Sequence, residues 1–152
     1  GQINCAVTFG LMISNNLNPG QAGINFVAQM FGSVFGALIL KLMFPKDKDL
    51  TGGLATNSVA PGWTQSQAFV GEVMGTFLLM FTVLETAINP AAEANKAFAC
   101  LAIGSSVFIA HSMLIPVDGC SINPTRSFGP AVVEALSTMN IAPLTDMWVF
   151  WV

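Results

Sequence analysis

Three long apolar segments limit what this chain can fold into more than any other feature of the sequence. They cover residues 21–44, 66–88 and 97–117 and are 24, 23 and 21 residues long. A helix needs about 20 residues to cross the hydrocarbon core of a bilayer. The first segment carries one charged residue, the second carries two and the third carries none. We therefore expect three membrane-spanning helices, and the apolar residues 144–152 are interpreted as the start of another.

The amino-acid composition supports a membrane protein. Charged residues make up 9% of the chain and hydrophobic residues 53%, whereas a typical soluble domain has about 25% charged residues. The net charge is −3 without a basic tract, so nucleic acid is not expected as a partner. The three cysteines are widely spaced and form neither a disulfide framework nor a zinc pattern. No metal or cofactor is expected.

Two eight-residue stretches are near copies of each other. Residues 3–10 read INCAVTFG and residues 122–129 read INPTRSFG. Each holds an asparagine, a residue that commonly caps a helix N-terminus, and a short apolar run follows each one. The resulting elements, residues 4–15 and 123–136, are too short to span a membrane and suit re-entrant half-helices. Irregular backbone at membrane depth is tolerated where it is buried or lines a water-filled cavity, so the pair predicts a pore at a repeat interface.

At these motifs the chain resembles the aquaporin (major intrinsic protein) family, and within it the water-selective members. The family signature is a pair of Asn-Pro-Ala motifs on two re-entrant half-helices. Here the motifs read Asn-Cys-Ala at residues 4–6 and Asn-Pro-Thr at residues 123–125, and Arg126 follows the second. The resemblance implies an all-α membrane fold with an inverted repeat, forming one partial channel domain over residues 1–152. It also implies that the first two spans and the end of the last one are absent from this chain.

The two motifs depart from the family pattern at one position each. Cys5 replaces the first proline and Thr125 replaces the second alanine. Proline at the first helical position has a preset φ, and it lacks an N–H group that would be unpaired there in any case. We expect cysteine to be accepted at this position with a less rigid turn.

The resemblance assigns pore-lining roles to five residues. Asn4 and Asn123 would donate hydrogen bonds to passing water at the positive ends of the two half-helices, whereas a single such asparagine would be an ordinary N-cap. Arg126, the only arginine in the chain, would line the narrowest point and repel cations. His111, twelve residues before Asn123, would narrow the pore below the width of a polyol. Cys120 would present its backbone carbonyl to the pore and an accessible thiol to mercurials.

Other residues are expected to support or tune the pore. By resemblance, Glu72 accepts backbone N–H groups of the second re-entrant loop, because a buried carboxylate needs partners. Four positions separate water channels from glycerol channels in the family, and here they hold Ser127, Ala131, Phe150 and Trp151. Glycerol-conducting relatives usually carry aspartate directly after the arginine, so Ser127 favours water.

The sequence therefore predicts a passive, multi-pass water channel that excludes ions and protons. By resemblance it would form a homotetramer, in a plasma or an intracellular membrane. Two alternatives of the same fold stay open: an aquaglyceroporin or small-solute channel, and a poorly conducting junction protein. An enzyme is not expected, because the chain shows neither catalytic-triad spacing nor a phosphate-binding loop.

Overall fold

The computed structural model describes residues 1–51 and 53–152, and within these residues it contains helices and no strand. The long helices are α2 (Pro19–Met43), α3 (Gln65–Val83) and α4 (Ala99–Asp118), and the shorter ones are α1 (Cys5–Ile13), α5 (Pro124–Thr138) and α6 (Ala142–Thr145). Short stretches of other helix types occur at η1 (Leu84–Ile88), η2 (Pro90–Phe98) and η3 (Met147–Phe150). Among the described residues, three continuous helical segments are long and apolar enough to cross a membrane: Pro19–Met43, Gln65–Ile88 and Pro90–Asp118.

Local capping determines where the long helices begin. Asn18 caps α2 by accepting the N–H of Gly20 at 2.8 Å, and Thr64 and Gln67 form a reciprocal capping box at the start of α3, which pairs otherwise orphaned N–H groups. The third apolar segment begins earlier than the expected residue 97. Asn89 accepts the N–H of Ala91 at 2.9 Å and so starts a helical turn at residue 90.

The end of the chain differs from the sequence-based expectation. Residues 144–152 do not form the start of a continuous span, and contain the last residues of α6 and the short turn η3. The Asp146 carboxylate separates the two elements, and it accepts the N–H of Val59 at 3.1 Å and the side-chain amide of Gln65 at 2.8 Å.

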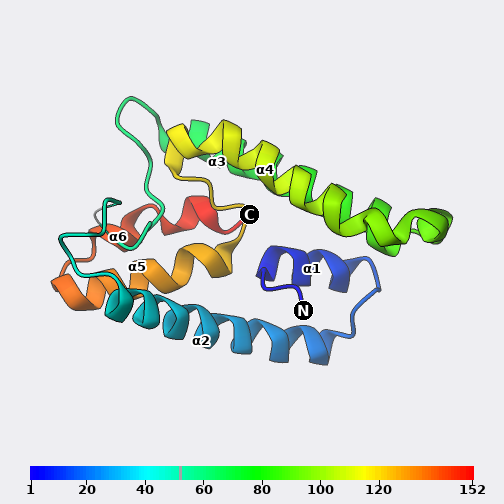
Figure 1. The fold of residues 1–152 in the computed structure, drawn as a ribbon, viewed down its shortest axis with the longest axis horizontal. Coiled ribbons are helices and arrows are strands. Elements are labelled where there is room, and N and C mark those ends of the chain that lie inside the picture. Colours follow the sequence, from blue (N-terminus) through cyan, green and yellow to red (C-terminus); the bar gives the residue numbers. More distant parts are fainter. Residues whose placement is uncertain (52) are drawn as a thin grey trace.

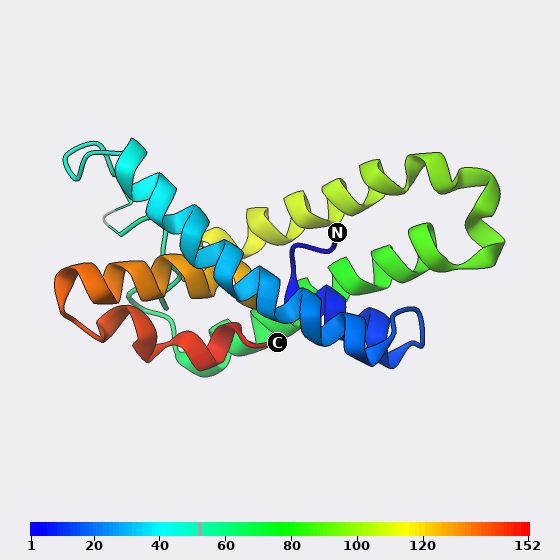
Figure 2. The same cartoon turned by 90° about the horizontal axis from the view of Figure 1, so that it is seen from below.

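The helices form two layers with the two short helices between them. Helices α3 and α4 lie side by side, α2 lies on the opposite side, and α1 and α5 lie between them (Figure 1). From the point where their N-terminal ends meet, α1 and α5 run in opposite directions (Figures 1 and 2). The two repeated motifs are therefore brought together at the centre of the molecule.

The apolar core surrounds this central point and leaves the outer helix faces open. Val7, Leu79, Leu114 and Phe150 belong to one buried cluster contributed by α1, α3, α4 and η3. In contrast, only 6% of the most apolar stretch of α2 is buried within the chain. An apolar helix face this exposed is suited to lipid or to further protein in the membrane. The chain is an integral, multi-pass membrane protein.

The segment between α2 and α3 turns back toward the start of α5. In its first part, the Thr51 hydroxyl and the N–H of Leu54 donate to the Asp49 carboxylate. The bond from Thr51 contributes most to lowering the pKa of Asp49 below its usual value. The turn leads to Ala55 and Asn57, whose oxygen atoms contact the central site.

Candidate functional site

The two repeated asparagines adopt nearly the same cap geometry. Asn4 has φ −157° and ψ 114°, and Asn123 has φ −163° and ψ 97°. The side-chain oxygen of Asn4 accepts the N–H groups of Ala6 and Val7, and that of Asn123 accepts the N–H of Arg126 at 3.3 Å. Both residues thus satisfy N–H groups that the first turn of a helix leaves unpaired.

Each asparagine also binds the backbone just before the other. The amide nitrogen of Asn4 donates to the carbonyl of Ile122 at 2.8 Å, and that of Asn123 donates to the carbonyl of Ile3 at 2.9 Å. Ile3 and Ile122 both have positive φ angles, 52° and 44°, which are rare for β-branched residues. This strained conformation occurs at equivalent positions of both motifs, so the two half-helices form a reciprocal, pseudo-symmetric junction.

Arg126 extends from the first turn of α5 to the segment before α3. Its Nη1 donates to the carbonyl oxygen of Ala55 at 2.7 Å and to Oδ1 of Asn57 at 2.8 Å. Asn57 is 2% exposed, and its own amide nitrogen donates to the carbonyl of Asp118 at 3.1 Å. The guanidinium group is thereby fixed to the segment before α3, which Asn57 links to the end of α4.

Ser127 directly follows Arg126 in α5 and is fully buried. Its hydroxyl oxygen is 2.8 Å from Oδ1 of Asn57 and 2.6 Å from the hydroxyl oxygen of Ser121. Ser127 therefore binds Asn57, one of the two acceptors of Arg126, from within the protein. Aspartate in its place would set a carboxylate against the Asn57 oxygen.

Two buried carboxylates hold the loop that precedes Asn123. Glu72, which is 0% exposed, accepts the N–H of Ser121 at 2.7 Å and the N–H of Ile122 at 2.6 Å. Asp118 accepts the N–H of Cys120 at 2.9 Å. Three consecutive N–H groups are thus paired with carboxylates. For Glu72 this is the contact that the family resemblance implies.

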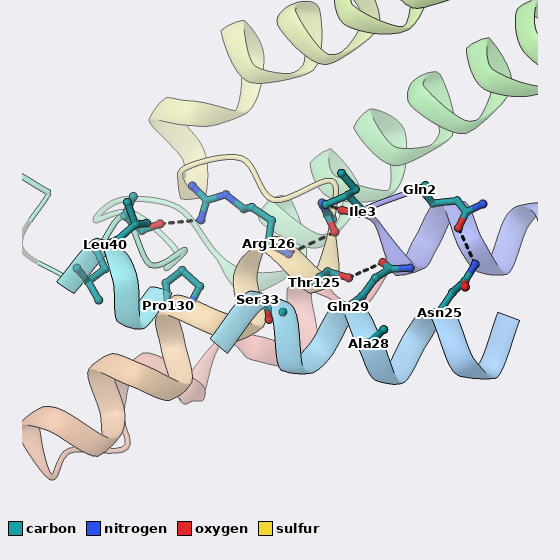
Figure 3. Close-up of a pocket in the computed structure, with 15 residues that line it drawn as sticks. Gln2, Ile3, Asn25, Ala28, Gln29, Ser33, Leu40, Thr125, Arg126 and Pro130 are labelled. Carbon is teal, nitrogen blue, oxygen red and sulfur yellow. Dashed lines mark hydrogen bonds between the residues drawn. The ribbon is translucent and has the colours of Figure 1, made fainter. Parts of the chain in front are cut away.

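A cavity of ≈ 800 Å³ opens beside the junction. Its polar lining includes the side chains of Gln29, Asn123, Thr125 and Arg126. Figure 3 shows Arg126 reaching along the cavity, while Thr125 points to Gln29 on α2. The structure therefore brings the second asparagine and the arginine into one cavity, and Asn4, 5% exposed, lies behind them.

The structure places His111 and Cys120 outside the lining of the described cavity. His111 is partly exposed on α4, and its Nδ1 is 2.8 Å from the carbonyl of Val107. A carbonyl only accepts, so Nδ1 is the donor in this contact. His111 is not among the residues that line the described cavity. Cys120 is 0% exposed, so the expectation of an accessible thiol is wrong: the loop backbone turns it inward at φ 53°.

The remaining water-versus-glycerol positions lie away from this cavity. Ala131 and Phe150 are buried at 0% and 1% exposure and contribute to packing. Trp151 is 46% exposed, and its ring centroid is 6.2 Å from that of Phe26 on α2.

Sequence reasoning missed Ala55, Asn57 and Gln29. Gln29 could have been found, because a polar side chain inside an apolar span marks a functional position by default. The loop residues gave no such signal. A partly buried arginine requires acceptors, but a backbone carbonyl and an asparagine 69 residues upstream cannot be selected from spacing.

Comparison with known proteins identifies the family. The family model described as "Major intrinsic protein" matches residues 1–152. The chain belongs to the major intrinsic protein family. Curated relatives of this family include "Probable aquaporin PIP2-8" of Arabidopsis thaliana, 39% identical over 157 residues, and "Aquaporin PIP2-5" of Oryza sativa subsp. japonica, 38% identical over 156 residues. Both alignments cover 100% of this chain and 54% and 53% of the relatives, so the chain spans about half their length.

A solved structure has the same fold. The X-ray structure of the aquaglyceroporin from Plasmodium falciparum matches with a TM-score of 0.84 and 19% sequence identity. The match covers 100% of this chain and 66% of that chain. The aquaporin-like fold expected from the two motifs is therefore confirmed.

Proposed function

We propose that the protein containing this chain is a passive water channel that excludes ions and protons. The observation that carries the proposal is the head-to-head junction of α1 and α5, with Arg126 fixed in the cavity beside it. Each half-helix N-terminus carries about half a positive charge, and the bound guanidinium adds a full one. Aquaporin pores are the standard example of selectivity by pore diameter, lining donors and half-helix dipoles. This chain has the donors and the dipoles.

The hydrogen bonds leave donors for water. An asparagine amide has two N–H donors, and Asn123 uses one on Ile3. Arg126 has five N–H donors, and its bonds to Ala55 and Asn57 both come from Nη1. The other donors are available to water in the cavity, and none of these residues accepts a proton at neutral pH. The site therefore favours binding a water oxygen over binding a cation.

The same proposal includes the filter and the assembly. We propose that His111 completes the narrow region around Arg126, in a homotetramer with one pore per subunit, and that permeation involves no chemical reaction. The imidazole ring of His111 would then restrict the pore width. Mercurial block through Cys120 stays a prediction, and it requires the buried loop to open first.

A solute-selectivity experiment tests this proposal. The full-length protein is reconstituted into vesicles, and shrinkage and re-swelling are followed by stopped-flow light scattering in a glycerol gradient. We expect rapid water efflux and glycerol entry no faster than in protein-free vesicles. Replacing His111 by glycine together with Arg126 by valine should admit glycerol, because the side chains that narrow the filter are lost.

The exposed Cys100 provides the control, since Cys100→Ser should change neither flux. Glycerol entry through the unaltered protein would support an aquaglyceroporin. Absence of both fluxes would support a junction protein of the same fold.

A further inference from the structure

The two departures from the Asn-Pro-Ala pattern contact each other. The backbone N–H of Cys5 donates to the hydroxyl oxygen of Thr125 at 3.1 Å. Proline at position 5 would have no N–H to donate, and alanine at position 125 would have no hydroxyl to accept it. Cys5 is 6% exposed and Thr125 4%, so neither group has free access to bulk water.

The internal repeat provides a reference for this contact. The offset of 119 residues that relates Asn4 to Asn123 also relates position 5 to Pro124 and position 6 to Thr125. The counterpart of the Cys5–Thr125 contact is therefore Pro124 with Ala6. That side of the junction combines a nitrogen without hydrogen and a methyl side chain. On one side of the junction, Cys5 and Thr125 are matched by a hydrogen bond. On the other side, Pro124 and Ala6 are matched because neither has a polar group there.

This hydrogen bond is the first of a chain that passes through α2 and returns to the first motif. The Thr125 hydroxyl donates to Oε1 of Gln29 at 3.1 Å, and Nε2 of Gln29 donates to the Thr8 hydroxyl at 2.8 Å. The Thr8 hydroxyl donates to the carbonyl of Asn4 at 3.0 Å. The chain of donors thus starts at the N–H and ends at the C=O of one peptide group, the one that joins Asn4 to Cys5. Such chains strengthen each bond through polarisation.

We propose that Cys5 and Thr125 form one coupled positioning pair, connected through Gln29, that sets the alignment of the two half-helices at the pore. A protein with only one of the two departures would have mismatched groups at the junction. With Thr125 replaced by alanine, the N–H of Cys5 is left buried and unpaired, which is more unfavourable than removing both partners. With Cys5 replaced by proline, the ring carbon Cδ takes the place of the hydrogen that points at the Thr125 hydroxyl, and the two groups collide. The melting-temperature test of this pair is independent of water conduction. Only the permeability measurement rests on the proposed function.

A double-mutant cycle on the full-length protein tests the coupling. The variants are Cys5→Pro, Thr125→Ala and the double substitution, each measured for thermal unfolding in detergent and for water permeability per channel in vesicles. We expect each single substitution to lower the melting temperature by about 3–8 °C and to lower permeability. The double variant should recover most of both, because it recreates the Pro–Ala combination that the other motif already uses.

Two further substitutions separate the hydroxyl from the side-chain volume. Thr125→Ser keeps the acceptor and should behave like the unaltered protein, whereas Thr125→Val keeps the shape and should behave like Thr125→Ala. Thr76→Val is the matched control, because the Thr76 hydroxyl is buried without a hydrogen-bond partner among the described residues. It should leave the melting temperature unchanged or raise it.

Additive effects of the two single substitutions would overturn the proposal, as would a Thr125→Ser variant as impaired as Thr125→Val. If the unaltered protein conducts no water, the proposed function fails. The melting temperatures still decide whether the pair is coupled.

Discussion

Replacing Gly129 by alanine should prevent the protein from folding stably. Helices α2 and α5 pack with their backbones in direct contact at this glycine. A Cβ atom at residue 129 would lie 2.2 Å from the carbonyl oxygen and 2.4 Å from the carbonyl carbon of Ser33. These are backbone atoms within α2, so no side-chain rotation relieves the collision.

The consequence extends to the pore. Overpacking a well-packed interface typically destabilises by about 1–3 kcal/mol, and by more where the backbone must move. Helix α2 also carries Gln29, which binds Thr125, so a shift of α2 disturbs the cavity lining. We expect little monodisperse protein in size-exclusion chromatography and a melting temperature at least several degrees lower.

Gly104→Ala on α4 is the control for this prediction. Nothing among the described residues lies within 4 Å of a Cβ placed at residue 104. Alanine is also favoured over glycine within a helix by about 1 kcal/mol. Equal behaviour of the two variants would contradict the packing described for α2 and α5.

Replacing Glu72 by alanine should have the second largest effect. The change leaves the N–H groups of Ser121 and Ile122 buried without their acceptor, in a loop where Ile122 is already strained at φ 44°. Hydrogen bonds to charged groups contribute about 1.5–3 kcal/mol each. We therefore expect a loss of about 3 kcal/mol or more in unfolding free energy, measured as a lower melting temperature together with lost water permeability.

A graded variant at Glu72 and a control variant at Glu85 both lie on the helical segment Gln65–Ile88. Glu72→Gln retains one acceptor oxygen and should give an intermediate loss. Glu85→Gln changes an exposed side chain that binds Asn89, and surface substitutions of this kind are usually within about 0.5 kcal/mol. A Glu72→Ala protein as stable as Glu85→Gln would show that the carboxylate does not hold the loop.

The sequence was sufficient to predict most elements of the fold, because the length of an apolar run and a capping motif are both local signals. An apolar run of about 20 residues indicates a span by length alone, and the repeated Asn motifs indicated two short capped helices. The start of the helical segment Pro90–Asp118 was missed because the cap at Asn89 precedes a turn that is not apolar. The interruption near Asp146 depends on Val59 and Gln65, which are distant in the sequence.

The site was predictable where one motif holds its residues, and for Glu72 where the family resemblance implies the contact. Asn4, Asn123 and Arg126 follow from the repeat and from the family resemblance. The buried thiol of Cys120 and the contact between Cys5 and Thr125 depend on backbone angles and on a 120-residue separation. Both departures from the family motif were visible in the sequence, but only the structure shows that they are hydrogen-bonded to each other.

The central claim is that the junction of the two half-helices conducts water and blocks charge. The most direct measurement follows osmotic shrinkage and internal pH in the same vesicles, with and without the full-length protein. The account predicts shrinkage many-fold faster than in protein-free vesicles, with no added proton flux under an imposed pH gradient. Shrinkage at the protein-free rate, or proton flux that rises with protein content, would contradict it.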